Sequence, residues 1–239
     1  DKNCGYFYET SQLSFRNIPG SPIAYWLSYA MIHAFNVGTA LSSIASPKQG
    51  MATADNNRFV RKWYEPDFRE VALPFSEDLK WYPYNNGGGF RRWFGFNTDV
   101  VNWENNGAAI KAFPKAYVRN ERDYFKSGIT WNAITSSDIS VRYFNSGYIF
   151  SNAGMAIFSD EHNLMLILSF INSAVAKSIL SAISPTLNYN AGDIANLPII
   201  ASKDHDVQLA TTCKDCIQRS KDDWDSYETS WDFKRNPLV

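Results

Sequence analysis

The stretch KWYPYNNGGGFRRWFGFNTDVVNWENNG, from Lys80 to Gly107, constrains the fold more than any other part of this chain. Its two halves are rich in aromatic and β-branched residues, which favour strands. Between them lies the sequence NNGGG at positions 85–89. Asn-Gly and Gly-Gly steps readily adopt the positive φ values that a turn between two strands requires. The stretch therefore predicts a β-hairpin with a flexible glycine centre.

The composition of the same stretch suits nucleic-acid binding. From Lys80 to Gly95 it carries a charge of +3, six aromatic residues and no acid. Glycine lets a backbone approach a ligand closely, and the planar fork of arginine binds phosphate or the edge of guanine. Aromatic rings stack on unpaired bases. Because strand aromatics also fill cores, a purely structural hairpin is the alternative interpretation.

Length and composition indicate a folded protein of the α+β class. The chain has 239 residues, of which 45% are hydrophobic and 20% charged. These values fit one large domain or two small ones. No apolar run approaches the ~20 residues of a membrane helix, and the opening DKNCGYFYETSQLSF has no apolar signal core. Three cysteines do not suggest a disulfide framework. We expect a cytoplasmic protein without a membrane span.

Charge is distributed unevenly along the chain. The net charge is −1, but residues 204–232 carry eight acids against three bases, so the remainder is basic by four charges. The basic part contains the glycine-rich stretch and a second mixture of basic and aromatic residues around Arg58, Arg61 and Lys62. Such a pattern favours a nucleic-acid surface. A solvated protein face is the alternative for the second cluster.

The periodicity of the remaining chain predicts three parts. Residues 1–50 form a helical segment whose helix begins at Ser21-Pro22 and ends near Gly38. Residues 51–158 form a β-rich core with alternating apolar positions. Residues 159–239 contain a long buried helix after Asp160, a short strand in DIANLPII and an amphipathic C-terminal helix. In that last helix, we expect Trp224, Tyr227 and Trp231 to pack against the domain.

No catalytic or metal motif is present in the sequence. The glycines match neither a P-loop nor a dinucleotide fingerprint, and there is no serine elbow or H-E-x-x-H. Cys213 and Cys216 form a single C-x-x-C, whereas a structural zinc site needs four ligands. We interpret these cysteines as structural and assign no catalytic residue and no metal.

Several long motifs resemble one family of enzymes. KWYPYNNGGGFRRWFG, VVNWENNG, YFKSGITWNAI and SPTLNYNAGDIANLPI are similar to the C-terminal half of large adenine-specific DNA methyltransferases. These are the PglX type of BREX phage defence and related single-chain type II restriction-modification enzymes. The long helix followed by a Leu-Pro strand also resembles the specificity domain of the TaqI methyltransferase.

The resemblance implies a single target recognition domain over residues 1–239, which selects the double-stranded DNA sequence to be methylated. Its other partner would be the N-terminal methyltransferase domain of the parent chain. That domain would hold S-adenosylmethionine, because the cofactor loop and the Asn-Pro-Pro-Tyr motif are absent here. The fragment itself is expected to bind no cofactor and to be non-catalytic.

Candidate contacts follow from this resemblance and from residue chemistry. Phosphate contacts are predicted for Arg58, Arg61 and Lys62. Base recognition is predicted from the glycine-rich stretch and the later strands, at Asn85, Asn86, Gly88, Arg91, Arg92, Thr130, Asn132 and Arg142. A β-rich module that binds carbohydrate or peptide is the competing function. An interaction domain that docks through its acidic terminal helix is a third.

Overall fold

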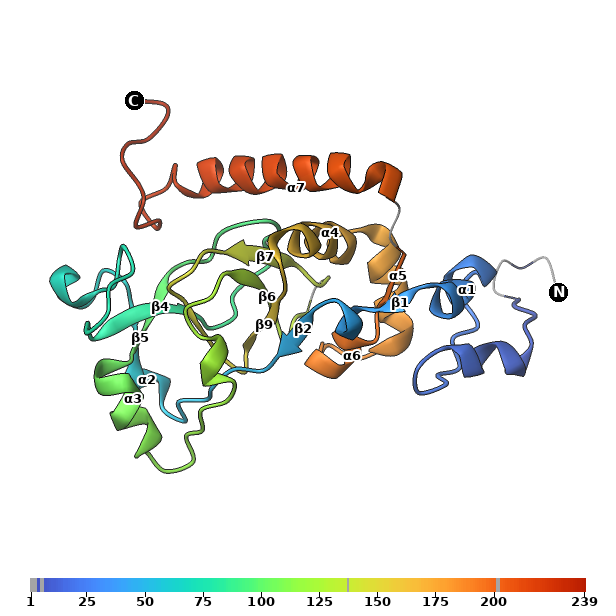
Figure 1. Cartoon of the computed structure of the whole chain (residues 1–239), viewed down its shortest axis with the longest axis horizontal. Helices are drawn as coiled ribbons and strands as arrows, with labels where there is room; N and C mark the ends of the chain where they lie inside the picture. The colour runs from blue at the N-terminus through green and yellow to red at the C-terminus, as the bar shows by residue number, and fades with distance from the viewer. Residues whose placement is uncertain (1–3, 5–6, 137, 201–202) are drawn as a thin grey trace.

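Two four-stranded sheets form the centre of the computed structural model, which describes residues 4, 7–136, 138–200 and 203–239 (Figure 1). The first sheet is antiparallel, in the order β2 (Ser46–Lys48), β9 (Gly154–Phe158), β6 (Gly128–Asn132) and β7 (Val141–Phe144). The second has the order β3 (Val60–Lys62), β5 (Asp99–Asn102), β4 (Trp81–Asn85) and β8 (Ile149–Phe150). A small third sheet pairs β1 (Thr39–Ala40) with β10 (Pro198–Ile199). The expected α+β class is confirmed.

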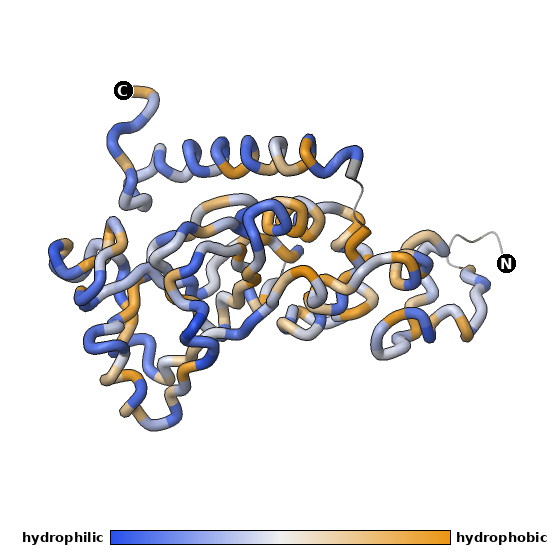
Figure 2. The backbone as a smooth tube through the Cα atoms, viewed as in Figure 1, coloured by the Kyte–Doolittle hydropathy of each residue, from blue (hydrophilic) through white to orange (hydrophobic). Residues whose placement is uncertain are grey.

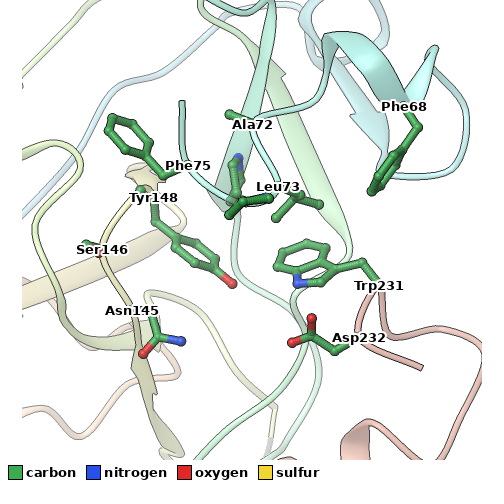
Figure 3. Close-up of a pocket in the computed structure, with 12 residues that line it drawn as sticks. Phe68, Ala72, Leu73, Phe75, Asn145, Ser146, Tyr148, Trp231 and Asp232 are labelled. Carbon is green, nitrogen blue, oxygen red and sulfur yellow. The ribbon is translucent and has the colours of Figure 1, made fainter. Parts of the chain in front are cut away.

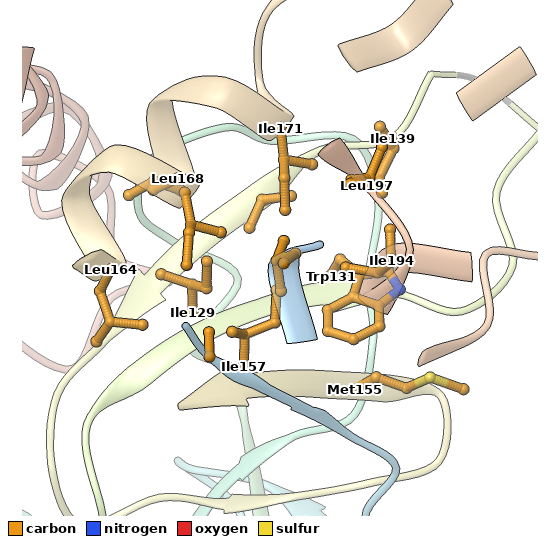
Figure 4. Packing of buried hydrophobic residues seen from close by; sticks show 14 of the residues in the cluster. Ile129, Trp131, Ile139, Met155, Ile157, Leu164, Leu168, Ile171, Ile194 and Leu197 are labelled. Atoms are coloured by element: carbon orange, nitrogen blue, oxygen red, sulfur yellow. The ribbon is translucent and has the colours of Figure 1, made fainter. Parts of the chain in front are cut away.

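Helices cover one face of the first sheet. Ile129 and Trp131 of β6 point to the same side and pack with residues of α4 (Glu161–Ile171) and α6 (Ala191–Ala195) (Figure 4). Ile129, Trp131 and Ile157 are completely buried. This apolar layer is the main core of the chain.

The opposite face of the first sheet packs on the second sheet through aromatic residues. Phe158 of β9 meets Phe150 of β8, with their ring centroids 5.2 Å apart, and Phe144 of β7 packs on Phe158 in the same cluster. Every residue of β6 and β9 is buried. The first sheet is therefore the middle layer of three. Both faces of its central strands β6 and β9 are covered, whereas Ser46 of the edge strand β2 is exposed.

The predicted hairpin is present, but its connection is long. Trp81 and Pro83 of β4 pair antiparallel with Asn102 and Val100 of β5. The strands are joined by residues 86–98, named here the β4–β5 loop, rather than by a two-residue turn. The middle of this loop leaves the hairpin and bridges to Arg142 of β7 through Trp93. This second attachment explains why a tight turn does not form.

The stretch predicted as one long helix contains two. After α4, Ser173 accepts a hydrogen bond from the Ala176 N–H and begins α5 (Ala174–Ile183), bent by 77° from α4. Val175 is consequently 51% exposed instead of continuing the buried stripe. Within the described residues, no single helix is long and apolar enough to cross a membrane; only this bent pair together reaches that length and hydropathy.

The two ends of the chain differ from the prediction in their boundaries. Ser28, not Ser21, caps α1 (Tyr29–Val37), because Ser21 has a φ of 48°; Gly38 ends the helix as expected. At the other end, α7 (Lys203–Trp224) runs along α4 (Figure 1) and alternates hydrophilic with hydrophobic residues (Figure 2). It places the buried Cys213 in the main core, where burial raises the pKa of the thiol.

Short elements complete the fold. DIANLPII, predicted as a strand, forms α6 and then the two-residue β10. The remaining helices are η1 (Gln12–Asn17), η2 (Leu41–Ser43), α2 (Asn56–Phe59), η3 (Phe68–Glu70), α3 (Glu104–Lys111) and η4 (Glu121–Asp123).

The buried carboxylate of Asp123 joins β2 to η4. Lys48 and Lys126 both donate to it, and its side chain is 7% exposed. Burial acts to raise the pKa of Asp123, but the two lysines outweigh burial and hold it below the ordinary value. Asp123→Asn should therefore lower the free energy of unfolding by about 1–3 kcal/mol at neutral pH. Chemical denaturation measures this difference.

The sign of the pH dependence follows from the lowered pKa. The stabilisation by Asp123 is complete above the unfolded pKa of ~3.9 and is lost as pH falls through the lower folded value. The gap between wild type and Asp123→Asn should close in that acid range. Asp215→Asn is the matched control, because Asp215 is exposed on α7 and its substitution should not affect stability. An equal effect of both substitutions would contradict the assignment.

Candidate nucleic-acid interface

The glycines of the β4–β5 loop are held by two buried side chains of the first sheet. Gly87 and Gly88 adopt φ values of 85° and 144°, which favour glycine. The Asn132 amide donates to the carbonyls of Gly88 and Gly89, and Arg142 donates to the Gly89 carbonyl at 3.4 Å. Arg142 also donates to the Asn132 side-chain oxygen at 3.1 Å. The strands thus fix the backbone of the loop.

Three residues predicted to reach a ligand from strand ends lie inside the protein. Thr130, Asn132 and Arg142 are 2%, 6% and 3% exposed. All three face the second sheet, and the Thr130 hydroxyl donates to the Met155 carbonyl at 2.8 Å. Burial, with a smaller contribution from the nearby Arg91 charge, lowers the pKa of Arg142 to about 10. These residues support the loop; in this structure they do not form its outer surface.

The two adjacent arginines of the loop have different surroundings. Arg91 donates to the Asp223 carboxylate at 2.7 Å, to the Ser220 carbonyl at 2.9 Å and to the Phe94 carbonyl at 2.7 Å. Arg92 lies over the Phe90 ring and has no acidic partner in the part of the chain that the structure describes. Arg91 is therefore held by α7, whereas the charge of Arg92 is unpaired.

The acidic helix α7 holds the β4–β5 loop through hydrogen bonds and ring contacts. Ser220 donates to the carbonyls of Arg92 and Phe94, and the rings of Trp224 and Phe96 lie 5.9 Å apart. Trp224 is buried, and the half-buried Trp231 packs on the second core, as expected. Tyr227 is 59% exposed, so the expectation for that residue was wrong.

Asp99 connects the two basic clusters that the sequence suggested. It accepts hydrogen bonds from Lys62 at 2.5 Å and from the Asn86 amide at 3.2 Å. Lys62 is therefore neutralised at the surface.

Asn85, which the sequence predicted to read bases, is 8% exposed, and its amide nitrogen has no hydrogen-bond partner within the described residues.

Two arginines near β3 keep an unpaired charge. Arg58 lies over the rings of Phe59 and Phe113, and Arg61 lies over Trp81. Neither has an acidic partner among residues 7–136, 138–200 and 203–239. Aromatic support leaves their charges available to a ligand.

A groove lined by side-chain amides lies beside the glycines and was not predicted. It consists of two adjoining clefts of about 340 and 330 Å³ that share Asn86, Asn152 and Ala153. None of its lining residues is charged. We call it the amide groove; its amide side chains are Gln49, Asn56, Asn86, Asn132, Asn152, Asn188 and Asn190. The only sequence signal was the repeated N-A-G at positions 152–154 and 190–192.

An aromatic pocket of about 530 Å³ lies on another part of the surface, between the β-rich core and the C-terminal segment (Figure 3). The rings of Tyr148 and Trp231 have centroids 6.0 Å apart, and Phe75 lines the same pocket. Asp232 and Asn145 supply polar groups.

Among the described residues, no three His, Cys, Asp or Glu side chains lie together as metal ligands would.

Comparison with known proteins relates this geometry to a family. No protein-family model matches the chain. It is 36% identical over 251 residues to the adenine-specific methyltransferase PglX of Lacticaseibacillus casei (strain Zhang), with 99% of this chain and 21% of that protein covered. It is also 36% identical over 241 residues to the adenine-specific methyltransferase BrxX of Escherichia coli O9:H4 (strain HS), with 99% and 19% covered. The chain is homologous to one segment of these methyltransferases. It spans about a fifth of their length.

The supporting role of Asn132 can be tested by stability. Asn132→Ala removes the hydrogen bonds to two loop carbonyls and leaves a donor of Arg142 without its partner. The free energy of unfolding should fall by about 1–3 kcal/mol in urea denaturation. Asn57→Ala, at an exposed amide, should leave it unchanged. Unaltered stability of Asn132→Ala would favour the original prediction of a ligand contact.

Proposed function

We propose that this chain is the double-stranded DNA recognition domain of an adenine-specific methyltransferase that acts in phage defence or restriction-modification in the cytoplasm. The observation that carries the proposal is the similarity over 99% of the chain to segments of two adenine-specific methyltransferases. In this proposal residues 1–239 act as one unit, related in plan to the specificity domain of the TaqI enzyme.

The arrangement of unpaired charges supports this function. Arg58, Arg61 and Arg92 supply positive charge, and Arg119 adds another beside Gln49 of the amide groove. Phosphate contacts from these residues would set the register of the duplex, and uncharged groups between them would read base edges. Asn86 and Gly88 lie on the walls of the groove, while Lys62 would need to leave Asp99 to contribute.

Catalysis would belong to a methyltransferase domain elsewhere in the parent protein. Such an enzyme takes its target base out of the duplex, so the DNA must be held from more than one side. A surface for that second domain is offered by exposed apolar residues near the N-terminal end, where Ile23, Trp26 and Tyr29 are 74%, 42% and 79% exposed. Apolar patches of this kind commonly mark protein interfaces.

The aromatic pocket favours the second candidate, a module that binds carbohydrate or peptide. The Phe75 and Trp231 rings and the Asp232 carboxylate line a surface on which a sugar or an extended peptide could pack, whereas Tyr148 is buried (Figure 3). Trp231→Ala separates the two functions. This variant should bind DNA as wild type does. If it instead loses binding to an oligosaccharide or peptide from a panel, the second function is supported.

The two adjacent arginines provide a matched test of DNA binding. Arg92→Ala should weaken binding to every duplex and reduce the slope of log K against log salt by roughly one unit, because one phosphate contact is lost. Arg91→Ala should reduce thermal stability through lost contacts to α7 and change the salt slope less. Fluorescence anisotropy at several salt concentrations and thermal melting measure both.

The ion-paired Lys111 supplies the control for this comparison. Lys111 contacts Glu121 at 2.7 Å at the surface, so Lys111→Ala removes a positive charge from another part of the protein. Identical salt slopes for wild type and Arg92→Ala would contradict the placement of Arg92 on DNA.

Cofactor binding gives an independent check. We expect calorimetric titration of this chain with S-adenosylmethionine to release no binding heat, because the sequence contains neither the cofactor loop nor Asn-Pro-Pro-Tyr. Titration of the same sample with duplex DNA shows that the protein is competent to bind. Saturable binding of S-adenosylmethionine at micromolar concentration would place a cofactor site in this chain. It would contradict the assignment of cofactor binding to another domain of the parent protein.

A further inference from the structure

We infer that the amide groove reads the major-groove edge of adenine-containing base pairs, with Asn152 and Asn188 as the specificity-determining residues. The inference rests on the proposed function and makes it specific. It shifts base reading away from the buried Asn132 and Arg142, which serve the scaffold. The lining of the groove, the free hydrogen-bonding groups in it and the rigidity of its floor carry the argument.

The amides of the groove differ in whether other residues of the protein already bind them. Asn132 is fully used by Gly88, Gly89 and Arg142, and Gln49 accepts from Arg119 at 2.6 Å. By contrast, the side chains of Asn152 and Asn188 make no hydrogen bond to any residue that the structure describes. Both line the same cleft. They therefore present donors and acceptors that the protein itself leaves unmatched.

A side-chain amide carries the hydrogen-bonding groups that match adenine. Asparagine offers one carbonyl acceptor and two N–H donors. Adenine presents the N7 acceptor and the N6 amino donor in the major groove, so one asparagine can pair with both atoms at once. A neutral amide has little attraction for phosphate. Groups of this kind contribute discrimination between bases more than overall affinity.

Hydrogen bonds fix the backbone near both asparagines. Ala133, just beyond β6, donates its N–H to the Ala153 carbonyl at 2.8 Å and accepts from the Tyr189 N–H at 2.7 Å. The turn that carries Asn152 and the segment that carries Asn188 are thus attached to one residue. The Ser151 hydroxyl oxygen accepts from the N–H groups of Ala153 and Gly154 at 3.0 and 2.8 Å. The backbone that carries both asparagines is therefore already ordered, and binding needs to order only their side chains.

Two arginines lie close to the amide groove in the chain or by contact. Arg119 is bonded to Gln49 in one cleft, and Arg58 belongs to the same short helix, α2, as Asn56 in the other. Positive side chains next to a neutral centre match a duplex, whose phosphates flank the base edges. The same arrangement would not suit a small anion, because no charged group lines the groove itself.

The test begins with selection of a preferred site from a randomised duplex library by the 239-residue chain, followed by sequencing. Asn152→Ala and Asn188→Ala should each relax the preference at one or two base pairs and weaken binding to the selected site by roughly ten- to hundred-fold. Their affinity for an unrelated duplex and their salt slope should match wild type. Gln208→Ala, at an exposed amide on α7, is the control and should change neither.

A chemical double-mutant cycle identifies the base. Replacing one adenine of the selected site by 7-deazaadenine removes the N7 acceptor and should weaken wild-type binding, but should weaken the paired alanine variant no further. Asn152→Leu and Asn188→Leu keep roughly the same size without adding a charge and remove both donors and the acceptor, so they repeat the test with a second side chain at each position. Thermal melting confirms the fold of each variant.

The outcomes separate this inference from the proposed function. If wild type selects a site and all variants keep the same preference, the inference is overturned while DNA recognition stands. Additive effects of 7-deazaadenine and each variant at every adenine would also overturn it. If wild type binds no duplex, the proposed function fails and the inference fails with it.

Discussion

The burial of both faces of the first sheet is the constraint on which the rest of this structure depends. Helices α4 and α6 cover one face, and the aromatic layer of the second sheet covers the other. Any polar side chain on these strands must consequently find partners inside the protein. Asn132 and Arg142 do so by binding the carbonyls of the β4–β5 loop. Because these buried polar side chains need hydrogen-bond partners, they also fix the backbone of a surface loop.

Acidic and basic residues that lie far apart in the sequence form ion pairs in the structure. The acidic helix α7 contributes Asp223 to Arg91 and Ser220 to the loop backbone, and Asp99 neutralises Lys62. The net positive charge counted along residues 80–95 therefore overstates what the surface presents. The arginines supported by aromatic rings retain their charge, since a ring provides contact without neutralisation.

The sequence predicted the class, the pairing of β4 with β5 and the burial of the apolar stripe in α4, because each follows from local propensity and periodicity. It did not reveal that both faces of β6 and β7 are covered, since the alternation of residues is the same whether the second face meets water or another sheet. The break before α5 depends on one capping serine among many candidates. The amide groove joins residues from five separate segments, and no local pattern encodes that proximity.

The glycine at position 154 has a consequence for how this protein can vary. A Cβ there would lie 2.5 Å from the Asn85 carbonyl oxygen and 2.7 Å from the Gly87 nitrogen, so β9 and the start of the β4–β5 loop are in direct backbone contact. Asn152 lies only two residues before this contact, on a turn outside the core strands. The wall of the groove can therefore accept new side chains while the frame beneath it stays unchanged. Under the proposed function, substitution at position 152 would change the base preference at little cost in folding.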